Sequence, residues 1–149
     1  MKFLLMNGPN LNMLGVREPE IYGNETLGDI EAEVVAYGEE RGVDIDCFQS
    51  NHEGALIDKL HASHTAYDGV IYNPGAHTHY SYALRDAVAS IATPVVEVHL
   101  SNINAREAFR AVSVIAPVCI AQIAGKGKAG YKQAVDELID YIYKRDLAK

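Results

Sequence analysis

The sequence of 149 residues contains no tryptophan, only two cysteines and fewer basic than acidic residues. Cys47 and Cys119 each lie in an apolar run and form no C-x-x-C motif, which predicts two buried free thiols and argues against a zinc ribbon. Lysine and arginine total 13 against 20 acidic residues, a net charge of −7. This balance argues against nucleic-acid binding, although local arginine and histidine side chains can still bind a small anion.

Long apolar segments are also missing. No run approaches the roughly 18 apolar residues that a membrane span needs, and the apolar stretch Phe3 to Met6 is too short for the core of a secretion signal. We therefore expect a cytoplasmic protein that contacts neither membranes nor nucleic acids. With 48% hydrophobic and 22% charged residues, a single globular domain spanning residues 1–149 is expected.

Short apolar runs alternate with amphipathic segments along the whole chain. Strands are predicted at residues 2–6, 43–48, 69–72, 94–98 and 118–123. Helices are predicted at residues 26–41, 51–63, 79–91, 101–112 and 129–145, the first capped by Thr26 and Asp29 and the second by Asn51. Residues 43–48 alternate in polarity and are typical of an edge strand. This order predicts an α/β, flavodoxin-like three-layer sandwich: a five-stranded parallel sheet with helices on both faces.

Ligands of such folds bind beyond the carboxyl ends of the strands, near the point where the strand order reverses. The first predicted strand is followed by a connection of unusual length, running from Asn7 to Glu25. Connections of this kind normally have about 2–6 residues, and longer ones are often functional. It contains Asn10, Arg17 and Tyr22, which favours a mobile lid over a plain surface insertion.

The segment after the fourth predicted strand is equally unusual. On an alternating strand, Glu97 and His99 share one side. The backbone N–H groups of Leu100 and Ser101 follow at the opening of a predicted helix, where anions bind. Arg110 lies further along the same element, within reach of the same anion.

Two other interpretations remain open from the residues alone. His77 and His79 follow the third strand and, together with Glu97 and His99, offer ligands to zinc, as in a metal-dependent hydrolase. This signal is weak because a two-residue histidine spacing is common by chance. A non-catalytic flavodoxin-like binding module is the other alternative, although the Asn-Gly-Pro-Asn turn lacks the hydroxyl residues and closely spaced glycines of a flavin phosphate loop.

Four segments resemble the type II 3-dehydroquinate dehydratase (type II dehydroquinase) family, in the family's order and over nearly the whole chain: NGPNLNMLGVREPEIYG, FQSNHEGALIDKLHAS, YNPGAHTHYSYALRDAV and PVVEVHLSNINAREAFR. The sequence departs from the family at Asn104, where histidine is usual, and at IAGKGKAGYKQAV, which is more basic than usual. The resemblance implies reversible dehydration of 3-dehydroquinate to 3-dehydroshikimate by anti elimination through an enolate, in the shikimate pathway of chorismate and aromatic amino acid biosynthesis. It also implies that no metal, cofactor or Schiff base takes part.

The resemblance further implies a role for each site residue. Tyr22 is the base, Arg17 keeps it ionised, and His99 is the acid that Glu97 orients. A free tyrosine has a pKa of about 10, so its anion at pH 7 costs about 4 kcal/mol, which a nearby guanidinium offsets in part. Asn10 and Asn73 contact the enolate, a bound water or substrate hydroxyls. Further substrate contacts are implied for His79, Arg110, Leu100, Ser101 and, from a neighbouring subunit, Asp86. The implied homo-oligomer is a dodecamer built as a tetramer of trimers.

Overall fold

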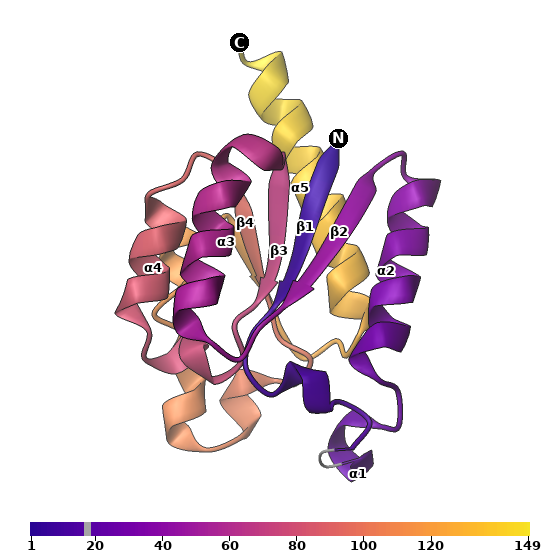
Figure 1. The fold of residues 1–149 in the computed structure, drawn as a ribbon, viewed down its shortest axis with the longest axis vertical. Coiled ribbons are helices and arrows are strands. Elements are labelled where there is room, and N and C mark those ends of the chain that lie inside the picture. Colours follow the sequence, from indigo (N-terminus) through magenta and orange to yellow (C-terminus); the bar gives the residue numbers. More distant parts are fainter. Residues whose placement is uncertain (17–18) are drawn as a thin grey trace.

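The computed structural model describes residues 1–16 and 19–149, and for residues 21 and 22 the backbone alone. Five parallel strands form one sheet in the order β2-β1-β3-β4-β5 (Figure 1). Their bounds are β1 Lys2–Asn7, β2 Asp44–Gln49, β3 Gly69–Asn73, β4 Val95–Val98 and β5 Ala121–Ile123. This is the strand order of flavodoxin-like folds, and the predicted fold class is confirmed.

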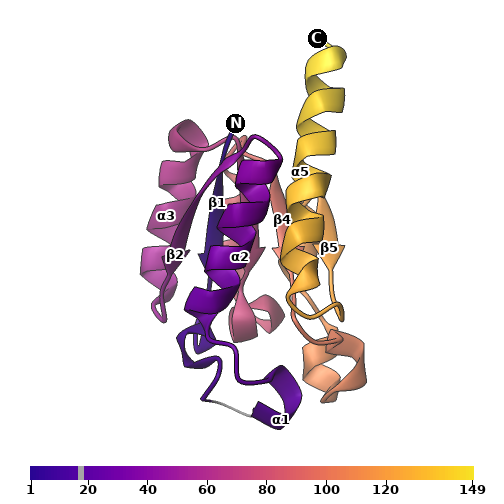
Figure 2. The ribbon, with the colours of Figure 1, turned by 90° about the vertical axis from the view of Figure 1, so that its right-hand side faces the viewer.

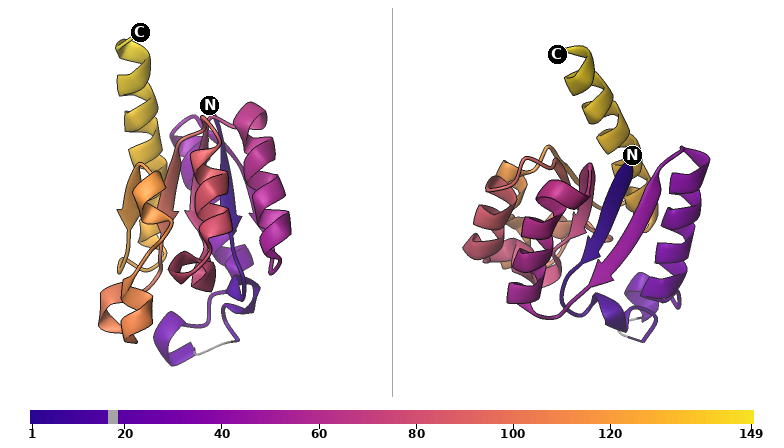
Figure 3. Two further views of the ribbon diagram at one scale, coloured as in Figure 1. Left: turned by 90° about the vertical axis from the view of Figure 1, so that its left-hand side faces the viewer. Right: turned by 45° about the horizontal axis from the view of Figure 1, so that its top comes forward.

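The helices form a layer on each face of the sheet, as Figures 2 and 3 show from the side. Helices α2 and α5 cover one face, and α3 and α4 cover the other. A short helix α1 lies below the sheet in Figure 1. The bounds are α1 Pro19–Tyr22, α2 Leu27–Glu40, α3 Glu53–Ala66, α4 Tyr82–Ala89 and α5 Ala129–Leu147. No helix within the described ranges is long and apolar enough to cross a bilayer.

Side-chain alternation along the strands produces two separate cores. Phe3 and Leu5 of β1 pack toward α2 and α5, whereas Leu4 and Met6 of the same strand pack toward α3 and α4. Successive residues of a strand point to opposite faces, so a sheet covered on both faces needs apolar residues at every position. The nearly continuous apolar runs of the central strands follow from this requirement.

Strand β2 lies at the sheet edge, as its alternating sequence predicts. Its position also corrects the expectation for Cys47, whose side chain is exposed rather than buried. An edge strand is covered only in part by its neighbouring helix, so an apolar run there does not guarantee burial. Cys119 is half-buried, and both cysteines are free thiols as expected.

Helix boundaries follow the local caps except where a polar side chain finds a distant partner. Thr26 and Asp29 form the predicted capping box of α2. The N-cap of α3 is His52, one residue after the predicted cap Asn51, because the Oδ1 of Asn51 accepts the backbone N–H of Asn10 at 2.9 Å instead. Helix α4 starts after Ser81, whose Oγ accepts the N–H of Leu84.

Two helix predictions are wrong. The helix predicted at residues 79–91 starts later than expected, and the helix predicted at residues 101–112 is not an α-helix. His79 ends a separate 3-10 turn, Gly75–His79, ahead of α4. The second segment forms two 3-10 turns, Ile103–Ala105 and Ala108–Ala111, instead of one helix. Phe109 and Val112 have helical spacing but remain exposed, and short helices depend on packing of such a face for their stability.

Candidate active site

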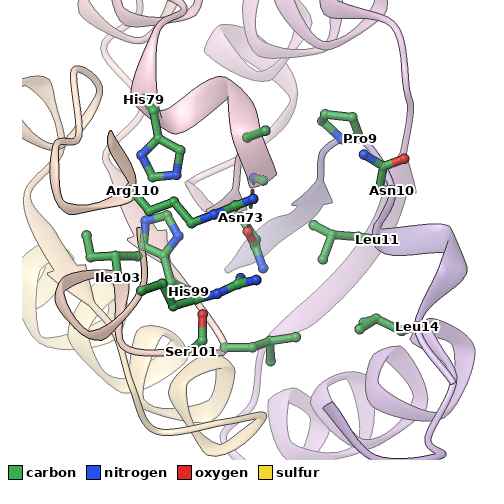
Figure 4. A pocket seen from close by; sticks show the side chains of 14 residues that line it. Pro9, Asn10, Leu11, Leu14, Asn73, His79, His99, Ser101, Ile103 and Arg110 are labelled. Carbon is green, nitrogen blue, oxygen red and sulfur yellow. Dashed lines mark hydrogen bonds between the residues drawn. The ribbon is translucent and has the colours of Figure 1, made fainter. Parts of the chain in front are cut away.

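A pocket opens at the carboxyl end of the sheet, where the loops after β1, β3 and β4 meet (Figure 4). Strands β1 and β3 are neighbours at the point where the strand order reverses, as predicted for a ligand site of this fold. The cavity volume is about 170 Å³, below the about 300–1,000 Å³ of pockets for drug-sized ligands, so it fits a small molecule. Its lining consists of Pro9, Asn10, Leu11, Leu14, Asn73, Gly75, Ala76, His79, His99, Leu100, Ser101, Ile103, Arg106 and Arg110.

Close backbone contact holds the first two loops together. The N–H of Gly8 donates to the carbonyl of Asn73 at 2.8 Å. A Cβ at Gly8 would lie 2.5 Å from the carbonyl oxygen of Pro74, a distance that no side chain tolerates. Asn10 follows with a left-handed φ of 69°, a conformation that asparagine adopts more readily than most residues. The turn therefore places Asn10 at the pocket rim, as expected of a site residue.

Asn73, at the end of β3, is held by a buried network. Its Nδ2 donates to the hydroxyl of Tyr131 at 3.0 Å, and its Oδ1 accepts the N–H of Gly75 at 3.1 Å. The Tyr131 hydroxyl in turn donates to Oδ1 of Asn7 at 2.6 Å. Burial raises the pKa of Tyr131 far above its ordinary value, so this hydroxyl stays protonated. Tyr131 of helix α5, which covers one face of the sheet, thus fixes the orientation of the Asn73 amide in the pocket.

His99, just after β4, forms a hydrogen-bonded pair with Glu97. The distance from Nε2 of His99 to Oε2 of Glu97 is 2.8 Å, and Glu97 is 0% exposed. Ser113 Oγ and Gln122 Nε2 also donate to this carboxylate, at 2.7 and 2.6 Å. Burial alone would raise the pKa of Glu97, but the hydrogen bonds from His99, Gln122 and Ser113 outweigh it and lower the pKa below 4.5.

The ionised carboxylate fixes the chemistry of the imidazole. Because a carboxylate only accepts hydrogen bonds, Nε2 of His99 carries a proton and Nδ1 is left for a pocket ligand. An imidazole backed by a buried carboxylate is suited to donate a proton to a leaving group. The predicted pairing of Glu97 with His99 is therefore present in the fold.

His79 and Arg110 line the same side of the pocket as His99 (Figure 4). The Nδ1 of His79 lies 2.7 Å from the carbonyl oxygen of Val112, so Nδ1 donates and Nε2 is left for a ligand. Arg110 stacks over the ring of Phe109, 4.8 Å from its centroid, and its Nε donates to Glu107 at 3.4 Å. These contacts position both side chains while leaving other donors to reach a ligand.

The described lining of the pocket is rich in basic side chains although the protein is acidic. Arg106 and Arg110 contribute two guanidinium groups and His79 and His99 two imidazoles, whereas no aspartate or glutamate belongs to the lining that is described. Such a lining favours a small anion over a neutral or cationic ligand. The arginine and histidine side chains that the sequence left open for binding a small anion do gather at this pocket.

Most of the residues predicted for the site come together in this pocket: Asn10, Asn73, His79, His99, Leu100, Ser101 and Arg110 line it, with Glu97 behind His99. Asp86 is exposed on α4 and does not belong to the lining. Arg17 lies outside the described residues, and so does the side chain of Tyr22, whose backbone ends α1.

Sequence reasoning missed several residues that build the site. Arg106 lines the pocket, and its place four residues before Arg110 on a polar loop was a usable signal. Gln122 was not predictable locally, because it meets Glu97 only through the register of β4 with β5. Tyr131 likewise reaches Asn73 across 58 residues of sequence.

The metal-site alternative finds no support among the residues that are described. No group of three or more His, Cys, Asp or Glu side chains in the described parts of the chain is arranged to hold a metal ion. The environment of His77 does not suit a metal ligand, because its ring is buried and packs edge-on against the ring of Tyr80, with 5.8 Å between the ring centroids. Burial also lowers the pKa of His77.

The fold and the pocket define a doubly wound α/β protein with a small pocket lined by arginine and histidine side chains and a carboxylate–imidazole pair suited to acid–base catalysis. The chain belongs to the class II dehydroquinase family, because the family model described as dehydroquinase class II matches residues 1–139.

Individual relatives agree with this assignment. The chain is 58% identical over 141 residues to a 3-dehydroquinate dehydratase of Anoxybacillus flavithermus, covering 95% of each chain. It is also 58% identical over 139 residues to a 3-dehydroquinate dehydratase of Bacillus mycoides, covering 93% of this chain and 95% of the relative. A solved type II dehydroquinase from Butyrivibrio crossotus superposes with a TM-score of 0.90 at 51% identity, covering 93% of this chain and 97% of that chain.

Proposed function

We propose that the protein catalyses the reversible dehydration of 3-dehydroquinate to 3-dehydroshikimate in the shikimate pathway. Membership of the class II dehydroquinase family and relatives named 3-dehydroquinate dehydratase support this reaction. The observation that carries the proposal is the buried Glu97–His99 pair beside a pocket with two guanidinium groups and no described acidic lining. A carboxylated substrate that loses a hydroxyl needs both features.

The elimination requires a base and an acid. The base removes a proton from the carbon beside the ketone, and the resulting enolate expels the hydroxyl group. We assign the base to the Tyr22 phenolate, kept ionised by Arg17, and the acid to His99, which protonates the departing hydroxyl so that it leaves as water. Glu97 stays ionised throughout and stabilises the imidazolium before the proton is transferred.

The arrangement of the loops supports this division of roles. Asn10 and Leu11 of the loop after β1 border the pocket across from His99 and Arg110 (Figure 4). The same loop continues to α1, which ends at Tyr22. An anti elimination needs its base and its acid on opposite sides of the substrate ring, and this loop occupies the side opposite the acid.

The other pocket residues bind the substrate in this proposal. Leu100 and Ser101 offer backbone N–H groups to the carboxylate, and His79 and Arg110 bind hydroxyl groups. Asn10 and Asn73 stabilise the enolate or hold a water beside it. Asp86 completes the site from a neighbouring copy of the chain.

The proposal extends to the setting of the enzyme. Residues 1–149 act as one catalytic domain, in the cytoplasm, without a cofactor. Twelve copies assemble as a tetramer of trimers, which would explain why Asp86 is exposed on α4 rather than part of its own pocket.

The test is an ultraviolet assay for the conjugated enone formed from 3-dehydroquinate. The wild-type protein should form it, also after chelator treatment, and borohydride added with the substrate should not inactivate it. Tyr22→Phe should lower kcat by about 10²–10⁴-fold, the usual contribution of a general base. The control Tyr143→Phe, whose side chain is exposed on α5, should leave kcat unchanged. An inactive wild-type protein would refute the function, borohydride inactivation would point to an imine mechanism, and more than a few per cent activity in Tyr22→Phe would remove Tyr22 as the base.

A further inference from the structure

The loop between β5 and α5 contacts the proposed anion site through its backbone. The N–H of Gly127 donates to the carbonyl of Leu100 at 3.0 Å, and the N–H of Gly125 donates to the carbonyl of Ser101 at 3.1 Å. In a trans peptide the N–H points opposite to the C=O. By binding the Leu100 carbonyl, this loop directs the N–H of Ser101 away from itself and holds it in place for a ligand.

The next residue of this loop, Lys128, reaches a different part of the chain. Its Nζ lies 2.8 and 2.9 Å from the two carboxylate oxygens of Glu25 and 2.9 Å from Oε1 of Glu33. Glu33 lies on α2, and Glu25 lies where the long loop after β1 returns to that helix. One ammonium group therefore joins three segments, and hydrogen bonds from Glu25 and Glu33 raise the pKa of Lys128 to about 12.

The middle of the long loop also approaches its end at Glu25. Gly15 has a φ of +88°, and a Cβ there would lie 2.9 Å from the carbonyl oxygen of Asn24 and 3.2 Å from that of Glu25. Backbone at Gly15, before the segment that carries α1, thus lies close to backbone at Asn24 and Glu25, after that segment. A contact that holds Glu25 in place therefore also holds the base of the loop segment that carries α1.

We propose that Lys128 is a positioning residue for the dehydration. Its ammonium group holds Glu25 next to Glu33 of α2, and in this way it fixes the base of the loop that carries α1. The inference rests on the proposed function, in which this loop supplies the catalytic base Tyr22. It also gives a role to a lysine of the basic segment IAGKGKAGYKQAV. The same short loop then supports both halves of the site, the anion cradle by its backbone and the base-bearing loop by its lysine.

The size of the effect follows from exposure. The three side chains are 40–45% exposed, and an exposed ion pair shifts an equilibrium by about two- to fivefold. With two pairs on one ammonium, loss of the charge should lower kcat by about three- to tenfold. KM should change by less than twofold, because the backbone contacts to Leu100 and Ser101 remain. Salt should weaken the anchor, since the Debye length falls to about 3 Å at 1 M.

The experiment compares Lys128→Met with Lys128→Arg and with Lys126→Met as the matched control. Lys126 lies in the same loop but donates to the neutral Gln133. We expect Lys128→Met to lose three- to tenfold in kcat at low salt, Lys128→Arg to recover most of it, and Lys126→Met to match the wild type. At about 1 M NaCl the wild type should approach the kcat of Lys128→Met.

A second variant, Glu25→Gln, tests the partner. It should reproduce most of the loss, and adding it to Lys128→Met should cost little more, because both changes break the same anchor. Wild-type kcat in Lys128→Met, an equal loss in Lys126→Met, or a loss confined to KM would refute the inference. A wild-type protein unable to dehydrate 3-dehydroquinate would instead refute the proposed function.

Discussion

Two buried tyrosines offer a matched test of the network that holds Asn73. Tyr131 and Tyr72 are both 0% exposed. The Tyr131 hydroxyl donates to Asn7 and accepts from Asn73, whereas the Tyr72 hydroxyl has no hydrogen-bond partner among the residues that the structure describes. Replacing either tyrosine by phenylalanine removes the same single oxygen atom. Any difference between the two variants therefore measures the hydrogen bonds and not the loss of volume.

The two substitutions should change the free energy of unfolding in different directions. In Tyr131→Phe, Oδ1 of Asn7 and Nδ2 of Asn73 each lose a buried hydrogen-bond partner, and each unsatisfied group costs about 1–3 kcal/mol. With partial relaxation, the free energy of unfolding should fall by about 2–4 kcal/mol. Tyr72→Phe removes a hydroxyl that is already desolvated without a partner, so stability should stay constant or rise by about 1 kcal/mol.

The assay is urea unfolding of both variants and the wild type at one protein concentration, because association shifts the apparent stability. Steady-state kinetics should show the same ranking: Tyr131→Phe frees the pocket amide of Asn73 and lowers kcat/KM, and Tyr72→Phe leaves it unchanged. If both variants lose equal stability, the hydrogen bonds to Tyr131 contribute nothing and the reasoning fails.

Three further tests concern ionisable groups. Glu97→Gln removes a charge-assisted hydrogen bond worth about 1.5–3 kcal/mol, so kcat should fall about 10- to 150-fold with little change in KM; an unchanged kcat would show that the charge is not needed. The fold lowers the pKa of Glu97. The stability that the ionised carboxylate contributes is therefore complete above about pH 5 and is lost as the pH falls through the pKa that Glu97 has in the folded protein. The free energy of unfolding of the wild type should decline more steeply below about pH 4.5 than that of Glu97→Gln. Although the Cys47 residue is exposed, desolvation of its sulfur and the neighbouring Glu31 carboxylate raise the pKa of its thiol to about 12. Iodoacetamide at pH 8 should therefore alkylate Cys47 at least about 100-fold more slowly in the folded protein than in the unfolded chain; rapid alkylation of folded Cys47, followed by mass spectrometry, would contradict this.

The layers of the fold were predictable because they depend on local periodicity. The runs at residues 2–6 and 69–72 are apolar at nearly every position, which only a strand covered on both faces requires. The alternation at residues 43–48 predicted an edge, and β2 is one. Local periodicity does not report how much of an edge a helix covers, and the exposure of Cys47 was therefore missed.

The site divides along the same line. His99, Asn73 and Asn10 were predictable because polar residues directly after buried strands must gather at one edge of a parallel sheet. The residues that hold them in place were not. Gln122 reaches Glu97 through strand register, and the Lys128–Glu25 contact spans 103 residues, so neither leaves a local pattern in the sequence.

Strand order also sets the distance across which the proposed chemistry works. The proposed acid, His99, follows β4, and the loop opposite it follows β1, with β3 between the two strands. Neighbouring strands lie about 4.8 Å apart, so these two loops begin about 10 Å from each other. Once side chains extend from both sides, that separation leaves room for one small ring and not for two. In the proposed reaction, the strand order β1-β3-β4 places the acid and the opposing loop on either side of a single substrate ring, which is the arrangement that an anti elimination requires.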